Sequence, residues 1–109
     1  MAQEFAASGP NRAPTHPGAI LREDVLPALN MTITDFAIKL GVTRQQVHRI
    51  LAEESDISTE MALRLGKICG NGPQLWLGMQ EARNLWLARA KLADELERIP
   101  NLNAEANAA

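Results

Sequence analysis

Tyrosine is absent from the 109-residue sequence, cysteine occurs once, and aromatic residues make up only 4% of the chain. Because Cys69 has no second cysteine to pair with, an internal disulfide is excluded and the fold needs no oxidising compartment. One cysteine and two histidines give no spacing typical of zinc ligands, and no catalytic constellation is found. We therefore expect no metal, no cofactor and no enzymatic activity.

Long apolar runs are also missing. No segment approaches the length of a membrane span, and residues 1–14 lack the apolar stretch of a signal peptide. The sequence thus predicts a protein with no membrane association, located in the cytoplasm.

An excess of positive charge is missing too, since the net charge is -2. This balance argues against binding nucleic acid over the whole surface, although a local basic site stays possible.

What the chain does contain is 46% hydrophobic residues, dominated by leucine, alanine and isoleucine. This composition is typical of packed helices, and the length suits one domain, so we predict an all-α fold. Residues 1–14, rich in small and polar side chains, are predicted to form a flexible N-terminal arm. We expect the folded helix-turn-helix domain, with a long C-terminal helix, to cover residues 15–99. Residues 100–109 are expected to form a flexible tail.

Capping residues, glycines and prolines predict about five helices. Pro17 suits a first helical turn, Pro27 helps to end that helix by about Leu29, and Gly41 suits a tight turn. The expected helices cover residues 17–29, 33–40, 44–52, 59–69 and 74–99. The side chains expected to face the core are Ala19, Ile20, Val25, Leu26, Ile33, Phe36, Ala37, Leu40, Val47, Ile50, Leu51, Met61, Ala62, Leu65, Ile68 and Cys69. In the fourth helix, Glu60 and Arg64 are expected to form an outward ion pair.

The second and third helices are separated by only about three residues, which is typical of a helix-turn-helix. Thr43 is expected to cap the third helix. The side of this helix opposite its apolar stripe carries Gln45, His48 and Arg49, flanked by Arg44 and Gln46. No acidic residue occurs between positions 35 and 53.

Two interpretations of this polar face stay open. Arginine can bond to guanine and glutamine to adenine in the major groove, while the helix N-terminus and the Thr43 hydroxyl can hold a phosphate. Alternatively, such residues only solvate an outer helix face, as they do in most proteins. The tight turn before the helix favours the DNA-reading interpretation.

The segment TITDFAIKLGVTRQQVHRIL resembles the helix-turn-helix of the lambda repressor-like (XRE) family. The flanking segments HPGAILREDVLPALNMT and ISTEMALRLGKICGNGPQLWLGMQEARNLW resemble HigA-type antitoxins. This resemblance implies a small, usually dimeric antitoxin of a type II toxin-antitoxin module of the HigBA kind. Such a protein represses its own operon and neutralises a cognate mRNA-cleaving toxin. On this resemblance, the DNA-contacting positions are Arg44, Gln45, Gln46 and Arg49 for bases, with Thr43 and His48 as nearby backbone contacts.

Two departures from the family pattern stand out. Ile33 replaces the glutamine with which many relatives begin the second helix. After the recognition helix, where relatives often carry glycine and a basic residue, this chain has the acidic loop EESD, residues 53–56. Carboxylates beside phosphates repel them, so either this loop points away or DNA affinity is modest and sensitive to salt.

The C-terminal helix offers a candidate interaction surface. Trp76 is expected to fill the core, whereas Trp86 and the seam of Leu85, Leu92 and Leu96 are hard to bury in so small a fold. A homodimer contact and a toxin contact both suit this surface. Two other functions stay open, namely a stand-alone transcription regulator and a protein-interaction module that no longer reads DNA.

Overall fold

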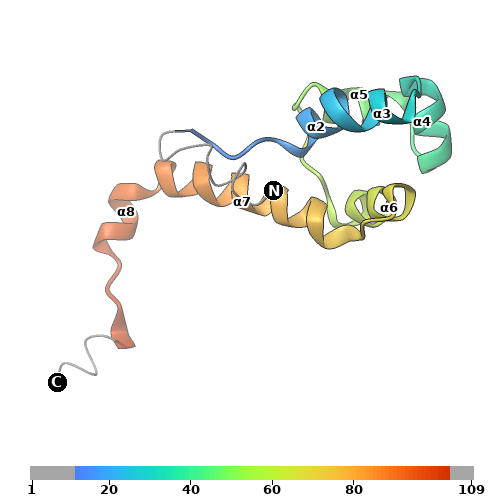
Figure 1. Cartoon of the computed structure of the whole chain (residues 1–109). Coiled ribbons are helices and arrows are strands. Elements are labelled where there is room, and N and C mark those ends of the chain that lie inside the picture. The colour runs from blue at the N-terminus through green and yellow to red at the C-terminus, as the bar shows by residue number, and fades with distance from the viewer. Residues whose placement is uncertain (1–11, 104–109) are drawn as a thin grey trace.

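The computed structural model describes residues 12–103, and every regular element in that range is helical (Figure 1). The predictions for residues 1–11 and 104–109 lie outside the described residues, and the proposed domain boundaries stay predictions. The elements are α2 (Pro17–Ile20), η1 (Leu21–Val25), α3 (Leu26–Leu29), α4 (Ile33–Leu40), α5 (Arg44–Leu51), α6 (Thr59–Cys69), α7 (Pro73–Lys91) and α8 (Ala93–Arg98). The predicted all-α fold is confirmed.

The elements α2, η1 and α3 run on as one helix that ends at Leu29, as predicted, because Asn30 takes a left-handed conformation. Its middle part, η1, is a π-helix in which the Leu26 amide bonds to the Leu21 carbonyl. Pro27 has no amide hydrogen and its ring would clash with a carbonyl one turn earlier, so a widened turn accommodates it. Leu21 also lies in the core, although it was not among the residues predicted to face it.

The turn between α4 and α5 is the predicted helix-turn-helix. Gly41 has a φ of 76°, and the amides of Gly41 and Val42 both donate to the Ala37 carbonyl, at 3.0 and 3.1 Å. Arg64 of α6 donates to the Leu40 carbonyl at 2.7 Å. The predicted pair with Glu60 is present at 3.9 Å, but Arg64 is not simply outward, because its guanidinium also caps the end of α4.

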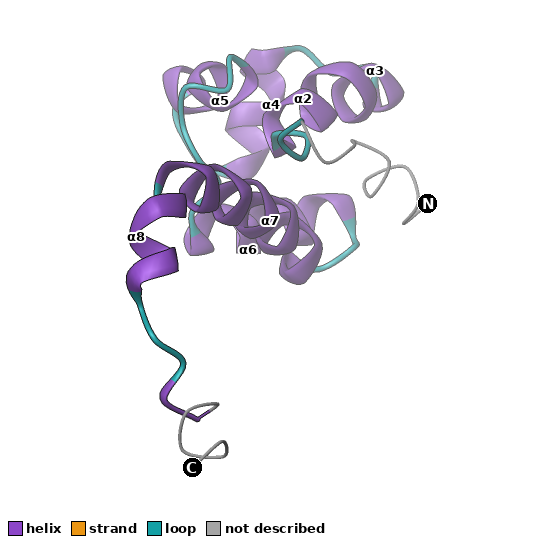
Figure 2. Ribbon diagram, turned by 90° about the vertical axis from the view of Figure 1, so that its left-hand side faces the viewer, coloured by secondary structure: helices purple, strands orange, loops and turns teal. Residues whose placement is uncertain are grey.

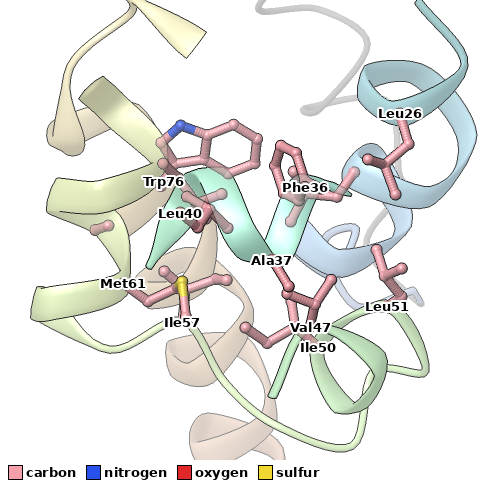
Figure 3. Packing of buried hydrophobic residues seen from close by; sticks show 13 residues of the cluster. Leu26, Phe36, Ala37, Leu40, Val47, Ile50, Leu51, Ile57, Met61 and Trp76 are labelled. Carbon is pink, nitrogen blue, oxygen red and sulfur yellow. The ribbon is translucent and has the colours of Figure 1, made fainter. Parts of the chain in front are cut away.

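The core lies where α4, α5, α6 and the start of α7 meet the first helix. Figure 3 shows Trp76 and Phe36 among the packed side chains, and both are fully buried, as predicted for each. Figure 2 shows α6 and α7 packed beneath the layer that contains α2 to α5. Several side chains predicted to face the core are half-buried and pack against its edge, namely Ile20, Val25, Ile33, Ile68 and Cys69, and Ala19 is half-buried too.

The predicted continuous helix 74–99 is wrong at Leu92, where α7 ends and α8 begins. Arg89 and Lys91 occupy the last turn of α7, and Asp94 and Glu95 the first turn of α8. Cations at a helix C-terminus and acids at an N-terminus are both favourable, so the charge pattern suits a break here. The end of α7 and all of α8 extend away from the packed helices (Figure 1). Within residues 12–103, no helix combines the length and apolar character needed to span a membrane.

Candidate DNA-binding surface

A reciprocal cap fixes the start of α5. The backbone amide of Gln46 donates to Thr43 Oγ1 at 3.0 Å, and the backbone amide of Thr43 donates to Gln46 Oε1 at 2.9 Å. The Thr43 hydroxyl also donates to Gln46 Oε1, at 3.1 Å. This capping box satisfies two backbone donors at the helix N-terminus, and it confirms the prediction that Thr43 caps α5.

The inner face of α5 is anchored by Val47, Ile50 and Leu51, which are buried as predicted. The predicted site residues all lie on the exposed surface of the helix and its cap, namely Thr43, Arg44, Gln45, Gln46, His48 and Arg49. Within residues 12–103, the side chains of Arg44, Gln45, His48 and Arg49 form no hydrogen bond or ion pair. The structure therefore brings two unpaired guanidinium groups onto one helix face that has no carboxylate between them.

Gln46 differs from its neighbours because its carbonyl oxygen is already used in the capping box. A bidentate contact with adenine needs both the carbonyl and the amide group of a glutamine. Such a contact by Gln46 would break the cap, whereas Gln45 has both groups free. The sequence predicted base contacts for both glutamines alike, whereas in the structure the cap engages only the carbonyl oxygen of Gln46.

The first helix holds the C-terminal end of α5, a contact that the sequence analysis missed. Gly18 packs so closely on α5 that a Cβ there would overlap with the Ile50 carbonyl oxygen. Four residues later on the same helix, Arg22 Nη1 donates to the Leu51 carbonyl at 2.6 Å. The only hint in the sequence is the spacing of Gly18 and Arg22, which places them one turn apart on one face.

His16 supports the same junction. Its Nδ1 accepts a hydrogen bond from the Gly18 amide at 2.9 Å and so caps α2, while the ring is buried. Burial and, secondarily, the charge of Arg83 lower the pKa of His16 below 6.5, against the opposing effect of Glu53 and Asp56. His16 Nε2 has no hydrogen-bond partner in the described part of the chain and lies 4.0 Å from Asp56 Oδ1. We conclude that the neutral form of His16 fits this position.

The acidic loop 53–56 turns back along α5. The amides of Glu54 and Ser55 both donate to the Arg49 carbonyl, at 2.9 and 3.2 Å. Ser55 and Asp56 line a groove beside α5 together with Gln46 and Arg49. Asp56 therefore lies next to the candidate DNA-binding face instead of pointing away from it.

Glu53 is directed toward the first helix. Its Oε2 lies 3.2 Å from Arg22 Nη1, and its backbone has a φ of 63°, a conformation that favours glycine. The ion pair with Arg22 fixes the Glu53 side chain at this turn. The side chain of Glu54, by contrast, is exposed and has no partner within residues 12–103.

Other candidate chemistry is sparse in residues 12–103. No group of three histidine, cysteine, aspartate or glutamate side chains in this range lies close enough to hold a metal ion. Cys69 is half-buried, and burial raises the pKa of its thiol, so it is less reactive than an exposed cysteine.

Comparison with known proteins identifies the family. The helix-turn-helix family HTH_3 matches residues 21–76, which extend from η1 to the start of α7 and include all of α5. The chain belongs to the HTH_3 family. This XRE-type assignment confirms the lambda repressor-like resemblance, and the HTH_3 family consists of regulators and not of enzymes.

Relatives of this HTH_3 protein include regulators and antitoxins. An HTH-type transcriptional regulator of Haemophilus influenzae is 39% identical over 75 residues, which cover 69% of this chain and 70% of that protein. The Pseudomonas aeruginosa antitoxin HigA, solved with the higBA promoter, is 32% identical with a TM-score of 0.75, covering 81% of this chain and 96% of that one. The antitoxin GraA, solved with its operator, is 35% identical with a TM-score of 0.73, covering 81% and 89%. The resemblance to HigA-type antitoxins is confirmed.

Proposed function

We propose that this protein is the DNA-binding antitoxin of a type II toxin-antitoxin module of the HigBA kind. It binds an operator upstream of its own gene, represses that operon and neutralises a cognate mRNA-cleaving toxin. The observation that carries the proposal is the exposed face of α5, which presents two unpaired arginines in a fold shared with operator-bound HigA and GraA. The proposal places the protein in the cytoplasm, where an operator is accessible.

In this proposal, Arg44, Gln45 and Arg49 read base edges in the major groove, because their side chains are exposed and free to form bidentate contacts. Thr43 and His48 contact the DNA backbone. Gln46 contributes only its amide group, since its carbonyl oxygen completes the cap of α5. Phosphates bind near the N-terminus of α5, where backbone amides of the first turn have no intrahelical partner.

A homodimer is the second part of the proposal. Two-fold symmetry places two recognition helices about 34 Å apart, in successive major grooves of one DNA face. The end of α7 and α8 expose a series of large apolar side chains that a partner could bury, namely Leu85, Leu87, Leu92, Leu96 and Ile99. A toxin contact on this surface is the competing use, and sedimentation with and without toxin distinguishes the two.

Operator binding is tested with duplex DNA from directly upstream of the coding sequence. We expect Arg44→Ala and Gln45→Ala each to weaken binding by about 1 to 3 kcal/mol, roughly 5- to 150-fold, and to relax specificity at one base position. Lys67→Ala is the matched control, because Lys67 is exposed at the end of α6, a helix that lies apart from α5 (Figure 1). If both α5 variants bind as tightly as the parent in a fluorescence titration, the assigned role of this face is wrong.

The antitoxin role needs a separate experiment. Co-expression of this protein should restore growth to cells that express the toxic reading frame adjacent to its gene. A neighbouring frame that is harmless, or toxicity that persists despite co-expression, would support a stand-alone transcription regulator instead. The result of this growth experiment does not change the result of the operator-binding experiment. The two halves of the proposal, DNA binding and toxin neutralisation, are therefore tested independently.

A further inference from the structure

We propose that Arg22 is a positioning residue for operator binding, which holds Glu53 against the first helix and compensates its charge beside the recognition helix. This inference rests on the proposed function. Arg22, which lies outside the helix-turn-helix, then controls how strongly the acidic loop opposes phosphate binding.

The contacts of Arg22 converge on the end of α5. Nη1 donates to the carbonyl of Leu51, the last residue of α5, at 2.6 Å and to Glu53 Oε2 at 3.2 Å. Nε donates to Glu23 Oε2 at 2.8 Å, which fixes the guanidinium from the other side. Only a planar group with several donors can make these contacts together, so lysine is no substitute.

The backbone and the side chain of Glu53 are held by different contacts. Its φ of 63° is unfavourable for a residue with a side chain, and its amide donates to the Ile50 carbonyl at 2.9 Å. Backbone hydrogen bonds of Glu53 and of the two residues after it hold this conformation, and the ion pair fixes where the Glu53 carboxylate lies. Without Arg22, we expect the carboxylate to move freely beside the phosphates that flank α5.

Electrostatics then determine the consequence for DNA. Glu53, Glu54 and Asp56 follow α5 within five residues, and Arg22 is the cation paired with one of them. An uncompensated carboxylate near DNA repels phosphates and reduces affinity for every sequence alike. Arg22 thus acts through Glu53, which distinguishes it from a residue that binds phosphate itself.

The experiment measures operator affinity of the full chain at several salt concentrations, using the upstream duplex. We expect Arg22→Gln to weaken binding up to about fivefold, the size of an exposed charge interaction. The double variant Arg22→Gln/Glu53→Gln should return to within about twofold of the parent, because it also removes the loop carboxylate that Arg22 compensates. Glu23, which loses Arg22 in the single and the double variant alike, lies in η1 on the first helix. Lys67→Gln at the end of α6 controls for the loss of one positive charge and should bind like the parent.

Each other outcome overturns the inference. If Arg22 bound phosphate directly, the slope of affinity against salt concentration would fall by about one phosphate contact in Arg22→Gln. Adding Glu53→Gln to that variant would then not restore the affinity. If Arg22 only supported the fold, the melting temperature would fall while affinity stayed unchanged. A parent protein that binds no upstream duplex at all refutes the proposed function, whereas a binding parent without rescue in the double variant refutes this inference alone.

Discussion

Replacing Gly18 by alanine tests the contact between the first helix and the recognition helix. An added Cβ would overlap with the Ile50 carbonyl oxygen and lie 2.9 Å from its carbon and 3.1 Å from His16 Nδ1. The obstructing atoms at residue 50 belong to the backbone, so no side-chain rotation relieves the overlap. The first helix must therefore move away from α5, and Arg22 would move with it.

The magnitude follows from packing and helix propensity. Forcing an extra methyl group into a well-packed site costs roughly 1 to 3 kcal/mol, and the overlap with backbone atoms places this variant in the upper part of the range, about 2 to 3 kcal/mol. Alanine recovers part of this, because it favours a helix over glycine by up to about 1 kcal/mol. A net loss of 1 kcal/mol lowers the melting temperature of a domain of this size by about 4 to 8 °C. We expect Gly18→Ala to melt roughly 4 to 16 °C below the parent.

Gly78→Ala is the matched control. Gly78 lies within α7, is exposed, and has no neighbouring heavy atom within 4 Å of an added Cβ. There the same substitution should stabilise the protein by about 1 kcal/mol, because only the helix propensity changes. Thermal melts followed by circular dichroism compare the two variants. A Gly18→Ala protein that melts with or above the parent would show that the two helices do not meet as described.

Three further predictions concern stability and capping. Gln80→Met should cost about 1 to 3 kcal/mol in urea unfolding, since Gln80 Oε1 accepts the buried Ile57 amide at 2.7 Å and the variant leaves that amide unpaired. Because the pKa of His16 is lowered, the unfolded state binds the proton more readily, and stability should fall as pH drops below 6.5. This slope should diminish in His16→Asn, which keeps a capping side chain; an unchanged slope would assign it to other groups. Thr43→Ala should cost about 1 kcal/mol and weaken operator binding, whereas Thr43→Ser should retain both properties.

Local sequence features predicted the helix boundaries well. Thr32, Thr43 and Ser58 cap α4, α5 and α6 through their side-chain oxygens, and Thr43 was predicted to do so. Gly41 and Gly70 end α4 and α6 in the left-handed conformation. Each of these features depends on hydrogen bonds that span at most a few residues, so neighbouring residues contain the necessary information.

Features that join distant segments were not predicted. The π-helical turn η1 was not predicted, because the α-helical period cannot show such a turn. Arg64 caps α4 from 24 positions away, which no spacing rule along one helix reveals. The break at Leu92 was also missed, although the charges around it favour it.

Helical periodicity and capping are local, so the sequence was enough to predict that α5 begins after Thr43, which of its residues are buried and which polar side chains are exposed. The surroundings of the ends of that helix depend instead on contacts between distant segments. Arg22 reaches the Leu51 carbonyl across 29 positions, and Glu53 pairs with the same guanidinium. The charge beside α5 that acts on a DNA phosphate depends on this pairing. The first helix and the acidic loop are neighbours only in the folded protein, so their pairing cannot be predicted from local sequence.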